Sequence, residues 1–244
     1  MNILISGGTR GIGKAVALSL AKPGNTLFLN YLRDEESAAE AKKEAEKKGA
    51  AVELFAANMA DPDDIASLFK AVGARVKTLD AVVHAAALGV FKPTSQLRVK
   101  DWDLSLDVNA KALLLLAQGA LPLMEKNGGA IVAISSLGAS RYTPNYGAIG
   151  ISKAALEDLV RYLAVELAPK RVRVNAVSGG LVDTESLEHF PDIGAMKKEF
   201  LKRTPGGRIG VPEDIARVVA FLIGEDSRWI YGQTLVADGG YSLS

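Results

Sequence analysis

The chain has 244 residues, of which 48% are apolar and 23% are charged, and its formal net charge is +1. This composition is typical of a globular protein, and the small net charge speaks against a nucleic-acid or membrane-surface binder, which needs a basic face. No cysteine is present, so disulfides, cysteine-ligated metals and thiol nucleophiles are excluded. Met1 leads directly into an apolar run without the charged start of a signal peptide. We therefore predict a cytoplasmic protein without a metal site.

Short apolar runs typical of strands alternate with helical periods along the whole chain. The predicted strands are 3–6, 26–31, 52–56, 81–84, 130–135, 172–177 and 234–237, and the predicted helices are 12–22, 34–48, 62–77, 102–125, 146–168 and 212–223. This alternation predicts a doubly wound (Rossmann) α/β fold, in which a seven-stranded parallel sheet carries helices on both faces. No linker or repeat divides the chain, so we expect a single domain over residues 1–244.

The two longest predicted helices are apolar over more than one face. The first contains four consecutive leucines at 113–116, and the second has a wide stripe formed by Leu156, Leu159, Val160, Leu163 and Leu167. A helix that covers one sheet needs only one apolar stripe. The surplus favours a subunit interface, and therefore a homo-oligomer (a tetramer, or else a dimer), over deep burial within a monomer.

A glycine-rich turn joins the first predicted strand to the first predicted helix and reads Ser-Gly-Gly-Thr-Arg-Gly-Ile-Gly over residues 6–13. Glycine permits a tight turn and a close approach of the backbone to a pyrophosphate, which lies at the positive end of the following helix. The turn therefore predicts a dinucleotide site formed by Gly7, Thr9, Arg10, Gly11, Ile12 and Gly13.

The end of the second predicted strand indicates which dinucleotide binds. NAD-specific sites usually carry an acidic residue there, which binds the ribose 2′-hydroxyl. Here residues 29–33 read Leu-Asn-Tyr-Leu-Arg, and the first carboxylate is that of Asp34. Because a guanidinium binds a phosphate well, Arg33 and Arg10 predict NADPH as the cofactor.

Further motifs follow in order along the chain. They are Asn109 in the run Asp-Val-Asn-Ala-Lys-Ala, the serine pair 135–136, the run Ser-Lys-Ala-Ala at 152–155, and the closing Val-Ala-Asp-Gly-Gly. Together with the glycine turn, they make the whole chain resemble the short-chain dehydrogenase/reductase family. The resemblance implies an acid–base tyrosine four residues before Lys153, but that position is Ile149.

Tyr146 precedes Lys153 by seven residues, about two helical turns, so both side chains project from nearly the same face. This spacing and the surrounding sequence resemble the enoyl-acyl-carrier-protein reductases, in particular the NADPH-dependent type III (FabL-like) enzymes. The resemblance implies that Tyr146 hydrogen-bonds the enolate oxygen and that Lys153 holds the ribose hydroxyls. It also brings Ser136 and Asn109 into the catalytic site. Two alternatives stay open. Tyr142, rather than Tyr146, supplies the hydroxyl, or Ser136 only caps the end of its strand.

The displaced tyrosine has a chemical reason. In ketone reduction the hydride reaches the same carbon whose oxygen the tyrosine protonates. In enoyl-thioester reduction the hydride reaches C3, whereas negative charge develops on the oxygen at C1. The acid must therefore stand farther from the nicotinamide, as Tyr146 does.

Other positions match the family's cofactor contacts. The resemblance implies contacts from Asn58, Met59, Ala86, Val182 and Thr184, of which the first faces adenine and the last two the nicotinamide edge. The family usually reads Asn-Asn-Ala-Gly after its fourth strand, whereas residues 84–87 here are His-Ala-Ala-Ala. We interpret His84 as structural, because no carboxylate is placed by the sequence to orient it.

Residues 185–208 lose clear periodicity and mix aromatic with basic residues. In the family this stretch is a substrate lid, and its basic cluster, Lys197, Lys198, Lys202 and Arg203, is suited to an acidic carrier protein. An exposed amphipathic helix is the alternative.

The leading prediction is NADPH-dependent reduction of the C2–C3 double bond of enoyl thioesters, linked to acyl carrier protein or coenzyme A, in fatty acid synthesis. The first alternative is an NADP-dependent ketoreductase or alcohol dehydrogenase on the same scaffold, for example one like the 3-oxoacyl reductases. A less favoured alternative is a non-catalytic NADP-binding protein.

Overall fold

The computed structural model describes residues 1–185, 187 and 193–244. Its centre is one seven-stranded sheet in the order β3-β2-β1-β4-β5-β6-β7, with every neighbouring pair parallel. The strands are β1 (Asn2–Ser6), β2 (Thr26–Tyr31), β3 (Ala51–Ala56), β4 (Ala81–His84), β5 (Gly129–Ser136), β6 (Val172–Gly179) and β7 (Thr234–Ala237). The predicted doubly wound fold is confirmed, and the strand predictions differ from these bounds by at most two residues.

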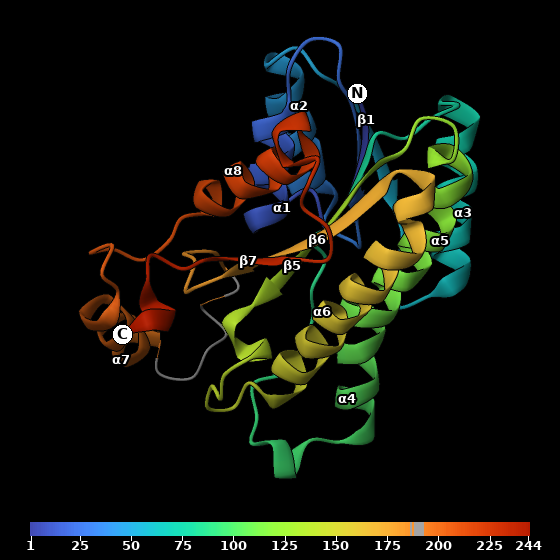
Figure 1. The fold of residues 1–244 in the computed structure, drawn as a ribbon. Coiled ribbons are helices and arrows are strands. Elements are labelled where there is room, and N and C mark those ends of the chain that lie inside the picture. The colour runs from blue at the N-terminus through green and yellow to red at the C-terminus, as the bar shows by residue number, and fades with distance from the viewer. Residues whose placement is uncertain (186, 188–192) are drawn as a thin grey trace.

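Helices cover both faces of the sheet (Figure 1). One face carries α1 (Gly11–Leu20), α2 (Glu35–Lys47) and α8 (Pro212–Ile223). The other carries α3 (Pro62–Arg75), α5 (Ala112–Met124) and α6 (Gly147–Leu167). The remaining helices are α4 (Val99–Leu106), which leads into α5, and α7 (Ile193–Arg203) near the C-terminus.

Strand β1 explains why the sheet has two cores. Its residues Ile3, Leu4 and Ile5 are all fully buried, because parallel strands are covered on both faces. Side chains alternate along a strand, so Leu4 joins the core beneath α3, α5 and α6, whereas Ile3 and Ile5 join the core beneath α1 and α8. A continuous apolar run in the sequence thus becomes two separate packing layers.

The helix predicted at 102–125 runs from Val99 to Met124 and contains a π-helical turn at Asp107–Lys111. By length and apolar composition alone this stretch is able to cross a membrane, a test that core helices also pass. Leu113 and Leu116 are fully buried against α3 and the sheet, as in a core helix.

The leucine-rich faces that favoured a subunit interface are used within the chain. The core takes up Leu113, Leu116, Leu156, Val160, Leu163 and Leu167, each of which is less than 9% exposed, and Leu115 and Leu159 are partly buried against it. Burial within the chain therefore explains the six core residues, whereas the homo-oligomer itself stays a prediction. The exposed apolar residues of α6 are others, namely Ile151, Tyr162 and Val165.

Strand order changes direction between β1 and β4, since successive strands are added on opposite sides of β1. In open α/β sheets, ligands bind at such a switch point, beyond the carboxyl ends of the strands. The glycine turn after β1, His84 at the end of β4 and Ser136 at the end of β5 all lie at this edge.

Candidate active site

The glycine turn packs tightly against the segment after β4. Gly7 and Gly11 have φ of +63° and +50°, a conformation that other residues rarely adopt. A Cβ at Gly7 would lie 2.8 Å from the backbone of Ala86, and one at Gly13 would lie 2.0 Å from the carbonyl oxygen of Gly7. Glycine at both positions is therefore required by space.

The N-terminus of α1 is open to an anion. Its N-cap residue, Arg10, makes no side-chain capping hydrogen bond within the part of the chain that the structure describes. The first amides of the helix therefore point outwards with the positive end of the helix dipole. Thr184, from the loop after β6, lies above Gly11, where its Cγ2 would be 3.6 Å from an added Cβ. The glycine turn and Thr184 therefore lie together at the N-terminus of α1, where the dinucleotide site is predicted.

The two arginines predicted to bind the 2′-phosphate are both exposed. Arg10 pairs with Asp34 at 3.5 Å, and Asp34 also caps α2 by accepting a hydrogen bond from the Ser37 amide. That hydrogen bond is the largest cause that lowers the pKa of Asp34. The Asp34 carboxylate thus contacts both the start of α2 and Arg10, while the Arg10 and Arg33 side chains stay exposed.

The other predicted adenosine contacts, Asn58 and Met59, follow β3. Asn58 is exposed, but its amide oxygen accepts a hydrogen bond from the Ala60 amide at 3.0 Å. The side chain of Met59 belongs to the core and is 5% exposed, which leaves its backbone for a ligand.

Tyr146 is the N-cap residue of α6, and its hydroxyl donates a hydrogen bond to Ser136 Oγ at 3.2 Å. Burial raises the pKa of the Tyr146 phenol, and the bond to Ser136 opposes the rise. The phenol is therefore protonated at neutral pH. Ser136 also accepts from the Gly138 amide at 3.3 Å, so the predicted capping role and the predicted site role are both compatible with its position.

Lys153 lies on the same side of α6 as Tyr146. It is 3% exposed, and its Nζ donates to the carbonyl oxygen of Ile134 at 2.6 Å. Burial lowers the pKa of Lys153 to about 8, and the Glu157 carboxylate acts against this effect. The spacing of seven residues thus brings both side chains to the end of β5, which the sequence had not predicted.

Asn109 lies in the π-helical turn, a feature often found at functional sites. Its side chain bridges Leu88 and Ser152: Oδ1 accepts from the Leu88 amide at 2.9 Å, and Nδ2 donates to Leu88 O and Ser152 Oγ, both at 2.8 Å. Every polar side-chain atom has a partner and the residue is fully buried. Its contribution to the site is therefore to hold the loop after β4 against α6.

His84 connects this network to the glycine turn. Its Nε2 lies 3.1 Å from the Asn109 carbonyl oxygen, which only accepts, so Nε2 carries the proton. Its Nδ1 then accepts from Ser6 Oγ at 2.8 Å. Burial, and next the charge of Lys153, lower the pKa of His84 to about 3. The histidine is neutral and fully hydrogen-bonded, in agreement with its structural interpretation.

Ile149, at the position where the family carries its tyrosine, is 8% exposed and packs against the loop after β4. An added Cβ on Gly89 would lie 2.1 Å from Ile149 Cγ1. Tyr142, the competing hydroxyl, is 89% exposed. Of the two tyrosines, Tyr146 is therefore the one built into the site.

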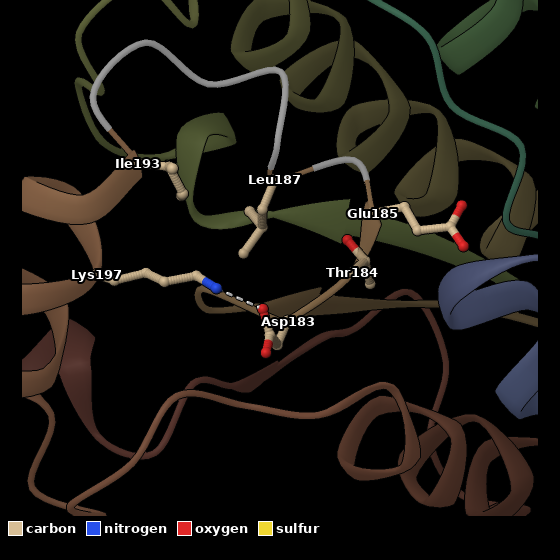
Figure 2. A pocket seen from close by; sticks show the side chains of 6 residues that line it. All are labelled: Asp183, Thr184, Glu185, Leu187, Ile193 and Lys197. Atoms are coloured by element: carbon tan, nitrogen blue, oxygen red, sulfur yellow. Dashed lines mark hydrogen bonds and ion pairs between the residues drawn. The ribbon is translucent and has the colours of Figure 1, made fainter.

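A groove of about 330 Å³ opens between the loop after β6 and α7 (Figure 2). Its lining residues are Asp183, Thr184, Glu185, Leu187, Ile193 and Lys197. Lys197 reaches across it and pairs with Asp183 at 2.7 Å. The groove joins Thr184, the predicted nicotinamide contact, to the predicted lid. The other predicted contact here, Val182, is 7% exposed.

The predicted lid, 185–208, contains helix α7, so the amphipathic-helix alternative describes part of it correctly. Residues 186 and 188–192, among them Phe190, lie outside the described residues. The end of α7 is fixed to the C-terminal segment, where the Phe200 and Tyr241 rings stack at 4.0 Å and the Arg203 guanidinium lies 4.7 Å from the Tyr241 ring centre. Lys198 and Lys202 are the exposed members of the basic cluster.

Three residues at the site carry no local signal in the sequence. Phe91, from the loop after β4, stacks on Tyr146 with ring centres 6.0 Å apart. A Cβ on Gly138 would lie 2.4 Å from the Tyr146 ring. Glu157 accepts a hydrogen bond from Ser135. Each contact joins residues from different elements or loops, so only the folded chain reveals it.

Comparison with known proteins identifies the family of this chain. A family model described as enoyl-(acyl carrier protein) reductase matches residues 7–242. The chain is 41% identical to a 1-cyclohexenylcarbonyl-CoA reductase from Streptomyces collinus, over 98% of this chain and 86% of that protein. It is 31% identical to a 3-oxoacyl-[acyl-carrier-protein] reductase from Staphylococcus aureus, over 97% and 96% respectively.

Among solved structures, the angucycline C-6 ketoreductase LanV with bound NADP is similar, with a TM-score of 0.92 and 31% identity. The match covers 100% of this chain and 96% of that one. The fold, the glycine turn and these full-length relatives lead to one conclusion: the chain belongs to the short-chain dehydrogenase/reductase family and is an NAD(P)-dependent oxidoreductase.

Proposed function

We propose that this protein is an NADPH-dependent reductase of the C2–C3 double bond of 2-enoyl thioesters, carried on coenzyme A or on acyl carrier protein. The observation that carries the proposal is the exchange of positions at the start of α6. Apolar Ile149 fills the place of the family's acid–base tyrosine against Gly89, and the Tyr146 hydroxyl lies one turn earlier beside Ser136. The similarity to a cyclohexenylcarbonyl-CoA reductase supports the same reaction class.

The residues of this chain have separate tasks in the proposed reaction. NADPH, when bound, supplies the hydride that reaches C3, and the resulting enolate takes up a proton from solvent at C2. The protonated Tyr146 hydroxyl, together with Ser136, donates hydrogen bonds to the thioester oxygen, where negative charge develops. Lys153 supplies a positive charge near this position and holds the ribose hydroxyls of the cofactor in this proposal. The hydrogen bonds of Asn109 and His84 hold the loop after β4, helix α6 and the glycine turn together.

A ketoreductase is the second candidate. The Tyr146–Ser136 hydroxyl pair is chemically able to polarise a ketone as well as a thioester carbonyl, and a ketoreductase is among the similar structures. In that reaction the hydride and the proton would go to the two atoms of one carbonyl group.

Oxidation of NADPH with crotonyl-CoA and with acetoacetyl-CoA separates the two candidates. We expect turnover of crotonyl-CoA to butyryl-CoA, with at least a tenfold lower kcat/KM for acetoacetyl-CoA. The opposite preference would assign the protein to the ketoreductases. Tight NADPH binding without turnover of either thioester would support a non-catalytic NADP-binding protein.

The cofactor preference has its own test. Replacement of either Arg10 or Arg33 by alanine should raise the KM for NADPH by about 10- to 100-fold, because a charge-assisted hydrogen bond contributes about 1.5–3 kcal/mol. The KM for NADH should stay unchanged. Lys43→Ala, an exposed basic residue on α2, is the matched control and should alter neither value. A parallel loss of NADPH and NADH binding would contradict 2′-phosphate recognition.

The proposed setting is a cytoplasmic homo-oligomer that acts in fatty acid synthesis. The exposed apolar side chains of Ile151, Tyr162 and Val165 on α6 supply a surface for self-association. Light scattering on the purified protein measures the oligomeric state directly.

A further inference from the structure

Three consecutive residues at the end of β5 are each hydrogen-bonded to a side chain of the α6 region. The Ile134 carbonyl oxygen accepts from Lys153 Nζ at 2.6 Å, and Ser136 Oγ accepts from the Tyr146 hydroxyl at 3.2 Å. Between them, Ser135 Oγ donates to Glu157 Oε1 at 2.5 Å. Lys153 and Tyr146 take part in the proposed reaction, whereas Glu157 does not contact any reacting group in it.

Glu157 is placed to act on Lys153. It follows Lys153 by four residues, one helical turn, and its side chain is turned towards β5 by the bond to Ser135. A buried ammonium needs a compensating charge, since removal from water disfavours its charged form. Lys153 is 3% exposed, so solvent does little to supply this compensation.

The charged groups around Lys153 indicate that Glu157 compensates the buried ammonium. Among the residues that the structure describes, the titratable groups that act electrostatically on Lys153 or respond to it are Glu157 on α6 and His84 on β4. His84 is neutral, because burial and Lys153 itself both disfavour its charged form. Tyr146, the other titratable group at the end of β5, is protonated and uncharged at neutral pH. Glu157 is therefore the one negative charge in this set.

We propose that Glu157 is a positioning residue of the active site, whose carboxylate, anchored by the Ser135 hydroxyl, keeps the Lys153 ammonium protonated and directed along β5. The Ser135–Glu157 pair thus adds a negative charge next to Lys153 without itself contacting cofactor or substrate. This inference rests on the proposed function for the task of Lys153, but the geometry of the pair is independent of the substrate.

The test compares Glu157→Gln with wild type and with Glu166→Gln, an exposed glutamate further along α6. Glutamine retains an oxygen that accepts from Ser135, so the variant removes the charge and keeps the bond. We expect the basic limb of the kcat/KM profile to move to lower pH by about one unit in Glu157→Gln, because Lys153 loses its counter-charge. The weakening of NADPH binding with rising pH should move in the same direction, and Glu166→Gln should match wild type.

Coincident pH profiles for folded Glu157→Gln and wild type would overturn the proposal, and so would an equal shift in Glu166→Gln. Ser135→Ala provides a second variant if Glu157→Gln does not fold. It keeps the carboxylate but releases its anchor, and a smaller shift in the same direction is expected, whereas no shift would count against the proposal. The NADPH titration reports on Lys153 even if no thioester is reduced, so failure of the proposed function is distinguishable from failure of this inference.

Discussion

Replacement of Tyr146 by phenylalanine is expected to lower kcat for crotonyl-thioester reduction by about 10²- to 10⁴-fold, the range typical of a lost acid or oxyanion donor. The Tyr146 hydroxyl lies partly buried beside Ser136, and burial raises the pKa of the phenol, so it is protonated at neutral pH. The phenylalanine ring retains the packing between Phe91 and Gly138, so the fold should be preserved. Steady-state kinetics and an NADPH fluorescence titration measure the two effects, and NADPH affinity should stay within about twofold.

The matched control is Tyr142→Phe, which removes the same hydroxyl from a side chain that is 89% exposed. We expect wild-type kinetics from this variant. A large loss in Tyr142→Phe together with an active Tyr146→Phe would transfer the hydroxyl role to Tyr142. The two single variants therefore decide between the alternatives that the sequence left open.

Replacement of His84 by leucine is expected to destabilise the protein by about 3 kcal/mol at neutral pH. Leucine fills much of the volume but leaves the Ser6 hydroxyl and the Asn109 carbonyl without their buried partner, at a cost of about 1–3 kcal/mol each. For a chain of this size the change corresponds to a Tm lower by roughly 6–12 °C. Denaturant unfolding and thermal scans measure it, and an unchanged stability would contradict the bridging role of His84.

Wild type and His84→Leu together also test the pKa of His84. Burial lowers this pKa to about 3, against an ordinary 6.5, so between these values the unfolded chain binds a proton that the folded chain does not. The stability contributed by neutral His84 is therefore present above pH 6.5 and is lost as the pH falls towards 3. Since one pKa unit corresponds to about 1.4 kcal/mol, the stability difference between wild type and His84→Leu should narrow steadily below pH 6.5. A constant difference from pH 7 to pH 4 would show that the folded histidine titrates normally.

Local patterns predicted the elements of this fold well because each has a local cause. The strand 81–84 and the helix 212–223 were predicted with the observed bounds, since apolar runs and a proline at the first helical turn depend on neighbouring residues only. For the segment that forms α7, the sequence did not decide between a lid and a helix, because its apolar and basic residues show no strong helical period. Its packing on Tyr241 depends on a residue near the other end of the described C-terminal segment.

The apolar surplus of the long helices shows the limit of pattern reasoning. Leu113 and Leu156 suggested a subunit interface because the sequence does not state how many elements cover a helix. In the folded chain α5 and α6 pack against the sheet and against other helices, which buries more than one stripe. The number of neighbours is a tertiary property.

At the site, the sequence by itself determined the glycine turn after β1 and the seven-residue spacing between Tyr146 and Lys153, because short stretches of one strand–turn–helix unit or one helix encode them. Only the tertiary structure decided which groups meet these residues. Ser136, Gly138, Phe91 and His84 reach Tyr146, Lys153 or Asn109 from other elements, and Glu157 is drawn to β5 by Ser135. A helical period fixes the face on which a side chain lies, but its partner, and hence its protonation state, depends on the strand that packs against that face.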